Sequence, residues 1–486
     1  MKNAAASQNH LACEVAIIGG GSAGYAAAQT AARAGLHTVV IEGGDEIGGL
    51  CILRGCMPSK ALLYAAEVLH LARAGKTWGL RIPRAGFDFP AMMARKKALI
   101  REFAKHRRDQ LTGGKFSFIR ARASFLDSHT VILHHRRLAA PKIVRAKYFV
   151  ICTGSVASPS PVPGLDEVGF INSDEALSLR KLPRSLIVLG GGPVAVELAQ
   201  FFCRLDVKVS LIQRGEHVLR DFDTDAAVVL ENVLQREGVR LWGDTRLLGA
   251  FRRGREKGIT FQHGKQKRRV AAEEILLALG REAATKGLDL EKAGVQTDHG
   301  RIVTDARMQT TAAHIYAAGD CTRPYQIVHI GIEQGEVAAH NIAHPGQERD
   351  MDYRLLTSVV FTDPQVASVG LTEKEALGLD IQYLTASHSF ADHGKSIIME
   401  AKDGFVKLLA DPESGEILGG GCVGPMGGEL IHEIIAAMHG RMKAQELAAM
   451  PHYHPTLAEI WTYPALELAE RVVGPGTRIG DVPRKA

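Results

Sequence analysis

Two cysteines, Cys51 and Cys56, stand five positions apart in the segment 48–60, a spacing that could support redox chemistry. In an ideal α-helix, Cα atoms five residues apart are separated by ~8.6 Å, whereas a disulfide needs roughly 4.4–6.8 Å. A bond between them therefore requires a distorted backbone, and Gly55 can absorb that distortion. Because a strained disulfide is easily reduced, the segment indicates a redox centre rather than a structural cross-link.

Two other interpretations of this cysteine pair stay open. A free cysteine behaves as a small apolar residue, so both thiols could simply be half-buried packing groups. A zinc site is disfavoured because cysteine ligand pairs usually stand closer together. The remainder of the chain decides between these interpretations.

A dinucleotide-binding turn is predicted directly before the cysteine segment. Residues 14–18 form an apolar strand, and Gly19, Gly21 and Gly24 follow it in a G-x-G-x-x-G spacing that opens an alanine-rich helix ending near Arg33. Such glycines allow a tight turn and close approach to a pyrophosphate, which the helix N-terminus attracts. The next strand, 37–41, ends at Glu42, about 20 residues after the turn, where a ribose partner is expected.

The same pattern recurs at residues 185–213. A strand over 185–189 leads into Gly190 and Gly192, with Ala195 in the third glycine position and a helix over 196–205. This variant of the turn is tolerated. The next strand, 207–212, ends without a carboxylate.

Arg214 and Arg220 flank the loop after that strand. Arginines in this place suit the 2′-phosphate of NADP, which a carboxylate would repel. We therefore predict NADPH in preference to NADH. The open alternative is that both arginines are solvated and pair with Asp221 and Asp223. Two dinucleotide folds in one chain suggest a tightly held flavin and a diffusible nicotinamide.

Composition places these elements in an ordinary globular enzyme. The chain has 486 residues, of which 46% are hydrophobic and 23% charged, with a net charge of +6. About two to four domains are expected for this length. The basic clusters at 252–255 and 265–269 indicate an exposed hairpin, either a solvated face or, less favoured, a polyanion site. We predict no nucleic-acid partner.

The seven cysteines are odd in number and widely spread, which is not the pattern of a secreted disulfide framework. Residues 1–13 lack the layout of a signal peptide, and no apolar run is long enough to span a membrane. We therefore predict a cytoplasmic protein without a membrane partner. In a reducing cytoplasm a disulfide is more often catalytic than structural.

Taken together, the chain resembles the pyridine nucleotide-disulfide oxidoreductases, and is most similar to their dihydrolipoamide dehydrogenase-like branch. The resemblance runs from about residue 13 to about 470. Its motifs are residues 19–24, 51–60, 153–154, 190–197, 280–281, 316–320, 358–365 and 452–459.

The resemblance implies an α/β fold with two Rossmann-like domains and a C-terminal α+β dimerisation domain. The FAD-binding domain is expected over 1–158 and 284–350, the NAD(P)-binding domain over 159–283, and the interface domain over 351–486. A homodimer with an active site shared across subunits is implied.

The resemblance also implies residue roles. Cys56 lies against the flavin and Cys51 faces the substrate. His454 reaches in from the other subunit to move protons, a task that suits the histidine side chain, and is oriented by Glu459. Lys60 and Glu197 form a pair near the flavin. His452 is expected only to pack or to lie on the surface.

Further cofactor contacts follow from the same resemblance. FAD would be held by Gly19, Gly21, Gly24, Glu42, Lys60, Thr153, Gly154 and Asp320. NAD(P) would be held by Gly190, Gly192, Ala195, Glu197, Arg214, Arg220 and Gly280.

Some positions depart from the family. Arg54 adds a charge between the cysteines, and could contact an anionic substrate or a neighbouring acid. Cys321 follows Asp320 and is expected to be a buried small residue, with an extra redox role as the lesser alternative. A mercuric reductase would need a cysteine pair near the C-terminus, and the last cysteine is Cys422. No metal site is predicted.

The predicted function is electron transfer between NADPH and a small disulfide or dithiol through FAD and the Cys51–Cys56 pair. The enzyme would be dihydrolipoamide dehydrogenase-like. A glutathione-type NADPH reductase is one alternative. A flavin-holding redox sensor without turnover is another.

Overall fold

The computed structural model describes residues 10–134 and 142–472. Three stretches lie outside the described residues: 1–9, 135–141 and 473–486. They belong to the segment considered as a signal peptide, to the predicted FAD-binding domain and to the predicted interface domain, respectively. The chain divides into two compact units. The first contains residues 1–61, 90–159 and 280–351, and the second contains 62–89, 160–279 and 352–486. Each is described by itself.

The first unit is built on a seven-stranded sheet in the order β3-β2-β1-β6-β5-β4, with β19 paired to β6. The central strands are parallel, and β4, β5 and β6 pair antiparallel. Val15 and Ile17 in β1 are fully buried, as expected where helices or loops cover both faces of a parallel sheet. The strands are β1 (His10–Ile18), β2 (Thr38–Glu42), β3 (Ser117–Arg120), β4 (Arg122–Asp127), β5 (Thr130–His134), β6 (Lys142–Ile151) and β19 (Ile315–Ala317).

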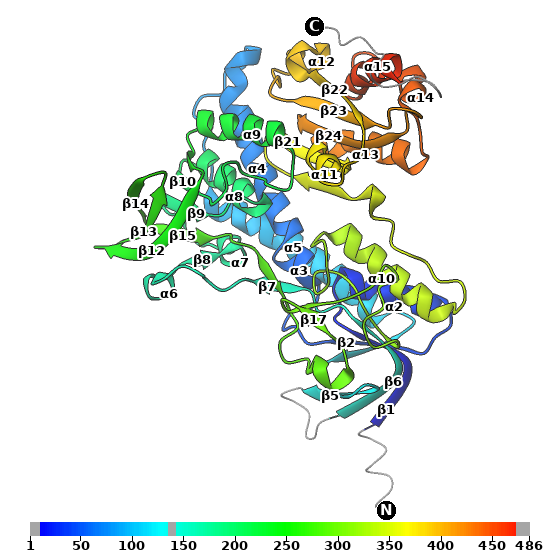
Figure 1. Cartoon of the computed structure of the whole chain (residues 1–486). Helices are drawn as coiled ribbons and strands as arrows, with labels where there is room; N and C mark the ends of the chain where they lie inside the picture. Colours follow the sequence, from blue (N-terminus) through cyan, green and yellow to red (C-terminus); the bar gives the residue numbers. More distant parts are fainter. Residues whose placement is uncertain (1–9, 135–141, 473–486) are drawn as a thin grey trace, which may run out of the picture. The chain divides into compact units, whose positions relative to one another are not determined.

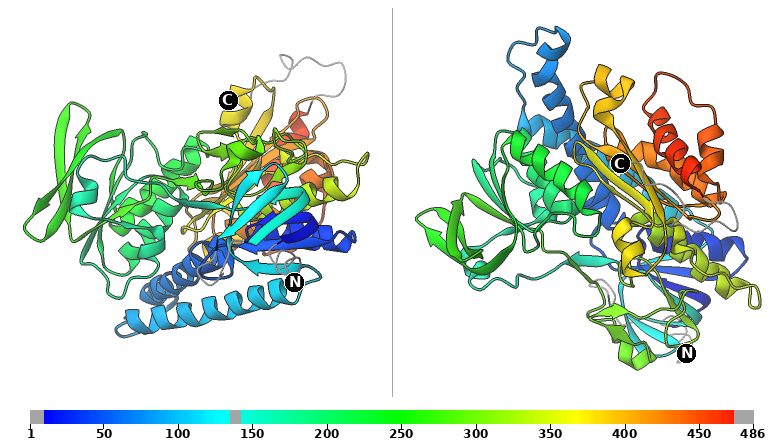
Figure 2. Two further views of the ribbon diagram at one scale, coloured as in Figure 1. Left: turned by 90° about the horizontal axis from the view of Figure 1, so that it is seen from below. Right: turned by 45° about the horizontal axis from the view of Figure 1, so that its top comes forward.

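Helix α10 packs closely along α2 in this unit (Figures 1 and 2). Glycine makes the approach possible, because a Cβ atom on Gly335 would lie 2.3 Å from the carbonyl oxygen of Ala23. Apart from α2, α10 and α5, the helices of this unit are short. The elements are α2 (Ser22–Arg33), α3 (Gly49–Leu53), α5 (Phe89–Thr112), η2 (Leu290–Ala293), α10 (Val328–Ala343), and the paired strands β7 (Ser155–Ala157) with β16 (Arg281–Ala283) and β17 (Thr297–Asp298) with β18 (Arg301–Ile302). Helix α4 (Cys56–Ala74) begins in the first unit, and its residues from 62 onward belong to the second.

The second unit contains a parallel five-stranded sheet in the order β11-β10-β9-β15-β8. Its strands are β8 (Ile171–Asn172), β9 (Ser185–Leu189), β10 (Lys208–Ile212), β11 (Arg240–Trp242) and β15 (Glu274–Leu277), with helices α6 (Leu165–Val168), α7 (Ser173–Ala176), α8 (Pro193–Arg204) and α9 (Thr224–Glu237) and the one-turn helix η1 (Gly75–Trp78) in the same unit. Helix α8 begins three residues before the predicted start because proline is well accommodated in a first helical turn.

An antiparallel sheet of β12 (Thr245–Arg253), β13 (Glu256–His263) and β14 (Gln266–Ala272) carries the basic clusters. Residues 252–255 and 265–269 are exposed on its hairpins, as the sequence predicted. The apolar segment 270–280 does not form a single strand. It is divided between β14 and β15, and these strands belong to different sheets.

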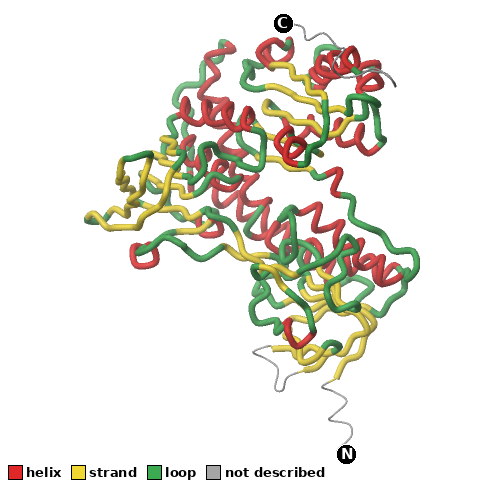
Figure 3. The backbone as a smooth tube through the Cα atoms, viewed as in Figure 1, coloured by secondary structure: helices red, strands yellow, loops and turns green. Residues whose placement is uncertain are grey.

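The C-terminal part of this unit is a five-stranded antiparallel sheet in the order β20-β21-β24-β23-β22. Figure 3 shows these strands beside the helices nearest the C-terminus. Trp461 and Phe390 are fully buried in their shared core. The elements are η3 (Tyr353–Leu355), β20 (Thr357–Val360), β21 (Gln365–Gly370), α11 (Glu373–Gly378), β22 (Leu384–Ser389), η4 (Phe390–Asp392), α12 (Gly394–Ile398), β23 (Phe405–Ala410), β24 (Ile417–Gly424), α13 (Gly427–His439), α14 (Ala444–Ala449), η5 (Ala458–Trp461) and α15 (Thr462–Arg471).

The predicted fold class, two Rossmann-like folds and a C-terminal α+β domain, is confirmed. The division into three domains at 158, 283 and 350 stays a prediction. Among the described helices, none combines the length and apolar character needed to cross a membrane.

Candidate active site

The first dinucleotide turn joins β1 to α2. Gly19 has a φ of 111°, and a Cβ atom on Gly24 would lie 1.9 Å from the Gly19 carbonyl oxygen, so the turn requires glycine at both positions. Glu42 ends β2 and accepts hydrogen bonds from the backbone N–H groups of Gly20 (2.7 Å) and Gly44 (2.6 Å). The carboxylate is thereby fixed at the edge of the turn.

This turn fits the pyrophosphate of FAD. Helix α2 has Gly21 at its N-cap and no acidic residue in its first turn, so the positive end of its dipole is neither capped by a side chain nor neutralised. A Cβ atom on Gly21 would meet only Gly49 Cα, at 3.8 Å, which leaves open space in front of the helix.

The other predicted FAD residues lie at the carboxyl ends of β6 and β19. Thr153 and Gly154 follow β6, and Asp320 follows β19 after two residues. Ser155 donates a hydrogen bond to Asp320 Oδ2 (2.7 Å), and Arg281 Nε donates to Ser155 Oγ (2.9 Å). Ser155 carries no distinguishing pattern in the sequence, and Arg281 stands out there only as part of the motif at 280–281. Together they hold the Asp320 carboxylate in place.

The redox segment lies against this turn. A Cβ atom on Gly49, the first residue of α3, would lie 2.7 Å from Gly21 Cα. Helix α3 carries Cys51, and α4 begins at Cys56. The side chains of the two cysteines share a hydrogen bond, which together with burial raises the pKa of Cys51 well above its ordinary value.

The expected backbone distortion falls between the cysteines, where the helix is interrupted at Arg54 and Gly55. Arg54 has an irregular conformation there, with φ −143°. Glycine suits position 55 because a Cβ atom there would make tight contacts, 3.1 Å to the Leu50 carbonyl oxygen and 3.3 Å to Cys51 Cα. The Arg54 side chain is exposed, and Lys60 is half-buried one turn after Cys56.

Arg107 of α5 is a charged neighbour of Cys51 that sequence analysis missed. Its guanidinium lies over the Tyr25 ring at 4.3 Å, and its Nε and Nη1 atoms are buried without a hydrogen-bond partner among the described residues. Its positive charge opposes the rise in the pKa of Cys51. An arginine in a long helix carries no sequence signal for such a role.

The second dinucleotide turn repeats the first with one changed side chain. A Cβ atom on Gly190 would lie 2.3 Å from the Ala278 carbonyl oxygen, and Ala195 is fully buried. Gln213 follows β10 as Glu42 ends β2, and its Oε1 would lie 2.8 Å from a Cβ atom on Gly191. A neutral amide thus stands where the first fold has a carboxylate.

The predicted nucleotide residues near this turn differ in environment. Gly192 is the N-cap of α8, and Gly280 has a φ of 111° beyond β15. Arg214 is exposed. Arg220 is exposed as well and forms an ion pair with Asp221 (3.3 Å), which is the alternative left open by the sequence.

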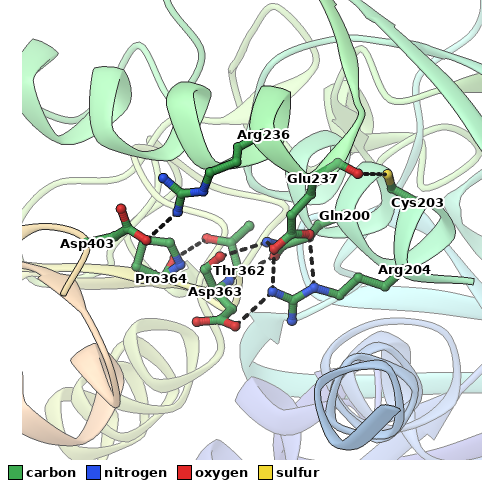
Figure 4. A network of polar contacts seen from close by, with 9 residues as sticks. All are labelled: Gln200, Cys203, Arg204, Arg236, Glu237, Thr362, Asp363, Pro364 and Asp403. Atoms are coloured by element: carbon green, nitrogen blue, oxygen red, sulfur yellow. Dashed lines mark hydrogen bonds and ion pairs between the residues drawn. The ribbon is translucent and has the colours of Figure 1, made fainter. Parts of the chain in front are cut away.

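Helix α8 presents a polar face to the loop 361–364. Glu197 is buried and accepts a hydrogen bond from the backbone N–H of Phe361 (2.9 Å). Gln200 bonds both backbone groups of Asp363. Arg204 bonds Glu237 and the Asp363 carboxylate, as Figure 4 shows. Glu197 is therefore held by its own unit; because Lys60 is assigned to the other unit, their pairing stays a prediction.

His454 and Glu459 are brought together. His454 Nδ1 lies 2.9 Å from Glu459 Oε2 and 3.2 Å from Oε1. The His454 side chain is 78% exposed, whereas that of Glu459 is 11% exposed. His452 packs, as expected, but its Nε2 also lies 2.6 Å from Glu433 Oε1, a partner that the sequence spacing did not reveal.

Cys321 is fully buried, as predicted, and its thiol donates to the carbonyl oxygens of Ile151 (3.3 Å) and Ala318 (3.4 Å). Burial raises its pKa to about 11, which keeps the thiol protonated.

Comparisons with known proteins agree with this geometry. Residues 13–335 match the pyridine nucleotide-disulphide oxidoreductase family, and residues 356–465 match the dimerisation domain of that family. The chain belongs to this family.

Its relatives cover nearly the whole chain. A dihydrolipoyl dehydrogenase of Chlamydia muridarum is 33% identical over 94% of this chain and 96% of its own length. A mercuric reductase of Streptomyces lividans is 33% identical over 95% and 96%. Among solved structures, LpdA of Mycobacterium tuberculosis has a TM-score of 0.85 at 28% identity and covers 94% of this chain and 99% of its own.

As a pyridine nucleotide-disulfide oxidoreductase, the protein is an FAD-dependent enzyme that moves electrons between NAD(P)H and a disulfide or dithiol. The predicted fold, enzyme class and flavin are thus confirmed. The choice of nicotinamide and the roles of individual residues remain predictions.

Proposed function

We propose that this enzyme uses NADPH to reduce a small disulfide, with Cys51 and Cys56 as the redox pair and His454 with Glu459 as the proton-transfer pair. The overall reaction consumes one NADPH, one proton and one disulfide, and yields NADP⁺ and two thiols. The enzyme works as a homodimer in which each site uses residues of both subunits. When bound, FAD accepts a hydride from the nicotinamide and supplies two electrons to the cysteine pair.

The contact between Cys51 and Cys56 beside the FAD turn carries this proposal. The sulfur atoms are hydrogen-bonded partners, and α3 starts directly against Gly21. Residues with these positions can alternate between disulfide and dithiol, whereas buried packing cysteines cannot.

Thiol–disulfide exchange accounts for the roles of the two cysteines. The Cys51 thiolate attacks the substrate disulfide and forms a mixed disulfide, and the first substrate thiolate leaves. The Cys56 thiolate then attacks the Cys51 sulfur, which closes the internal disulfide and releases the second thiolate.

The His454–Glu459 pair would supply the protons for these leaving groups. Because the Glu459 carboxylate can only accept, the bonded Nδ1 atom of His454 carries the proton. Nε2 is then the atom that takes up and gives up a proton, and the exposed ring is available to a substrate.

Preference for NADPH rests on Gln213 and Arg214. The Gln213 amide does not repel a 2′-phosphate, unlike the carboxylate in the equivalent place of the first fold. Arg214 is exposed and supplies positive charge. Arg220 contributes less because Asp221 partly neutralises it.

A dihydrolipoamide dehydrogenase activity is the second candidate, because several relatives carry that name. Steady-state rates with NADPH and NADH against lipoamide, oxidised glutathione and an aromatic disulfide separate the two. We expect NADPH-dependent reduction of at least one disulfide. Efficient lipoamide turnover with NADH alone would contradict the NADPH preference, and bound FAD without disulfide turnover would favour a redox sensor.

The Cys51→Ser variant tests the mechanism. It should lose disulfide reduction and retain NADPH oxidation with an artificial electron acceptor, because hydride transfer to the flavin does not use Cys51. Full disulfide activity in this variant would refute the exchange step.

A further inference from the structure

A second histidine, His393, also lies beside the Glu459 carboxylate. His393 is the residue between η4 and α12, and its side chain is fully buried. Its Nε2 atom lies 3.4 Å from Glu459 Oε1. No sequence pattern links His393 to residues 454–459, because they are distant along the chain.

The neighbours of the two ring nitrogens favour one tautomer of His393. Nδ1 lies 2.8 Å from the hydroxyl oxygen of Ser396, which is also fully buried. Because the ionised Glu459 carboxylate can only accept hydrogen bonds, its approach to Nε2 at 3.4 Å favours a proton on that atom, and Nδ1 then accepts from the Ser396 hydroxyl. In the described part of the chain, Nε2 makes no hydrogen bond of good geometry, and Glu459 Oε1, at 3.4 Å, is the carboxylate oxygen recorded beside it.

We propose that His393 is a positioning residue for the proton-transfer pair. Its neutral imidazole, held by Ser396, fixes the plane of the Glu459 carboxylate, which in turn orients the His454 ring. This inference rests on the proposed role of His454 and Glu459 in disulfide exchange.

The surroundings keep His393 neutral. Among the described residues, the charged or titratable groups near it are Glu459 from η5, His388 from β22, His454 and Tyr463 from α15. Burial is the main cause that lowers the pKa of His393 below its usual value of 6.5; the two histidines act in the same direction and Glu459 opposes them. A neutral donor orients the carboxylate without cancelling the negative charge that stabilises protonated His454.

A packing role is the alternative. The ring contacts Phe390 and Tyr463 in edge-to-face geometry, with centroids 6.4 Å apart in both cases. If packing were the whole role, any substitution that preserves the fold would preserve the chemistry. The two roles therefore predict different behaviour for a substitution that keeps the N–H donor.

Three variants test the proposal. His393→Leu removes the donor, His393→Gln keeps an N–H donor, and Ser396→Ala removes the bond that favours this tautomer. His439→Gln, at the exposed end of α13, serves as the matched control. For each purified holoenzyme, the rate of NADPH-driven flavin reduction, the turnover of the disulfide, the pH profile of kcat/KM and the midpoint of thermal unfolding are measured.

We expect His393→Leu to lower disulfide turnover by about ten-fold, part of the contribution of a general acid–base group, and to shift its pH profile. Flavin reduction by NADPH should not change. His393→Gln should restore most of the turnover, Ser396→Ala should give an intermediate loss, and His439→Gln should match the wild type.

Wild-type turnover and pH profile in His393→Leu would overturn the proposal. So would an equal loss in the Leu and Gln variants, because that result follows packing rather than the donor. The His454→Gln variant separates the two levels of inference. If it keeps full disulfide activity, the proposed function fails; if it is inactive while His393→Leu is unaffected, only the role of His393 fails.

Discussion

Glu42 and Gln213 occupy equivalent places in the two dinucleotide folds and differ in one functional group. Glu42 accepts hydrogen bonds from two backbone N–H groups of its turn. Gln213 approaches Gly191 in the same way, but without a charge. This single difference supports the proposed preference for NADPH over NADH.

Replacement of Gln213 by Glu should reverse the nucleotide preference. The new carboxylate would repel the 2′-phosphate and could accept a bond from the ribose of NADH. We expect the ratio of kcat/KM for NADPH to that for NADH to fall by about ten-fold or more, equivalent to about 1.4 kcal/mol. Arg214→Ala should lower the same ratio, whereas Arg253→Ala on the exposed hairpin should leave it unchanged.

Buried His393 should also make stability depend on pH. Its pKa in the folded protein is lowered from 6.5, chiefly by burial, so at mildly acidic pH the unfolded chain binds a proton that the folded chain excludes. Above the unfolded pKa, His393 does not reduce the free energy of unfolding. As pH falls from that value toward the folded pKa, the free energy of unfolding decreases.

Thermal unfolding of the wild type and His393→Gln checks this. The wild type should lose more stability than the variant between about pH 7.5 and about pH 5.5. Parallel losses in the two proteins would show that other groups cause the pH dependence.

At the level of elements, α8 links two parts of the second unit. Glu197, Gln200 and Arg204 follow one another at helical spacing and bind the loop 361–364. The Arg204 side chain is 6% exposed and that of Glu237 is 13% exposed. A buried charge in such a network is costly to leave without its partner.

Arg204→Ala should therefore lower the midpoint of thermal unfolding. The free energy of unfolding should fall by about 3–5 kcal/mol, because the substitution leaves a buried charge without its partner. Arg236→Ala is the matched control, because its ion pair with Asp403 also joins α9 to the C-terminal part but is exposed at 60% and 46%. Exposed pairs contribute about 0–1 kcal/mol. Figure 4 shows both pairs. Equal effects of the two substitutions would contradict a buried network.

The turn before α2 allows protein packing to be separated from cofactor binding. Gly24→Ala should disrupt the turn itself, because its Cβ atom would clash with the Gly19 carbonyl. Gly21→Ala meets only an ordinary contact with Gly49. We expect Gly21→Ala to keep the far-UV circular dichroism of the wild type and to lose bound FAD, measured by the ratio of flavin to protein absorbance.

Gly378→Ala, in α11, has no atom within 4 Å of its new Cβ and provides the control. Full FAD retention in Gly21→Ala would mean that the pyrophosphate does not approach this position.

At the level of the whole molecule, we predict that two inactive variants can restore activity in a mixed dimer if the active site is shared between subunits. A site built from one chain alone would not be restored in this way. Cys51→Ser and His454→Gln chains are each expected to be inactive as homodimers. A hybrid dimer would combine Cys51 of one chain with His454 of the other and regain one intact site. Random assembly should restore about a quarter of wild-type disulfide turnover in a symmetric dimer.

Co-expression of the two variants with different affinity tags, followed by isolation of the doubly tagged dimer, measures this directly. The isolated hybrid should have about half the wild-type rate, since one of its two sites is complete. An inactive hybrid would show that each site is built from one chain.

Much of the local structure of this protein could be predicted from the sequence. The strands over 185–189 and 37–42, the glycine turns and the start of the redox segment follow from local patterns, because turn geometry and strand burial depend on neighbouring residues. The His454–Glu459 pair could also be found, since its two members stand only five residues apart and meet across one turn.

Only the tertiary structure brought together residues that are distant in sequence. His393 reaches Glu459, Arg107 approaches Tyr25, and Glu433 pairs with His452 through packing of separate elements. The division of residues 270–280 between two sheets was likewise a matter of long-range pairing. Local propensity contains no information about such contacts, because they form only when burial of apolar surface fixes the elements against one another.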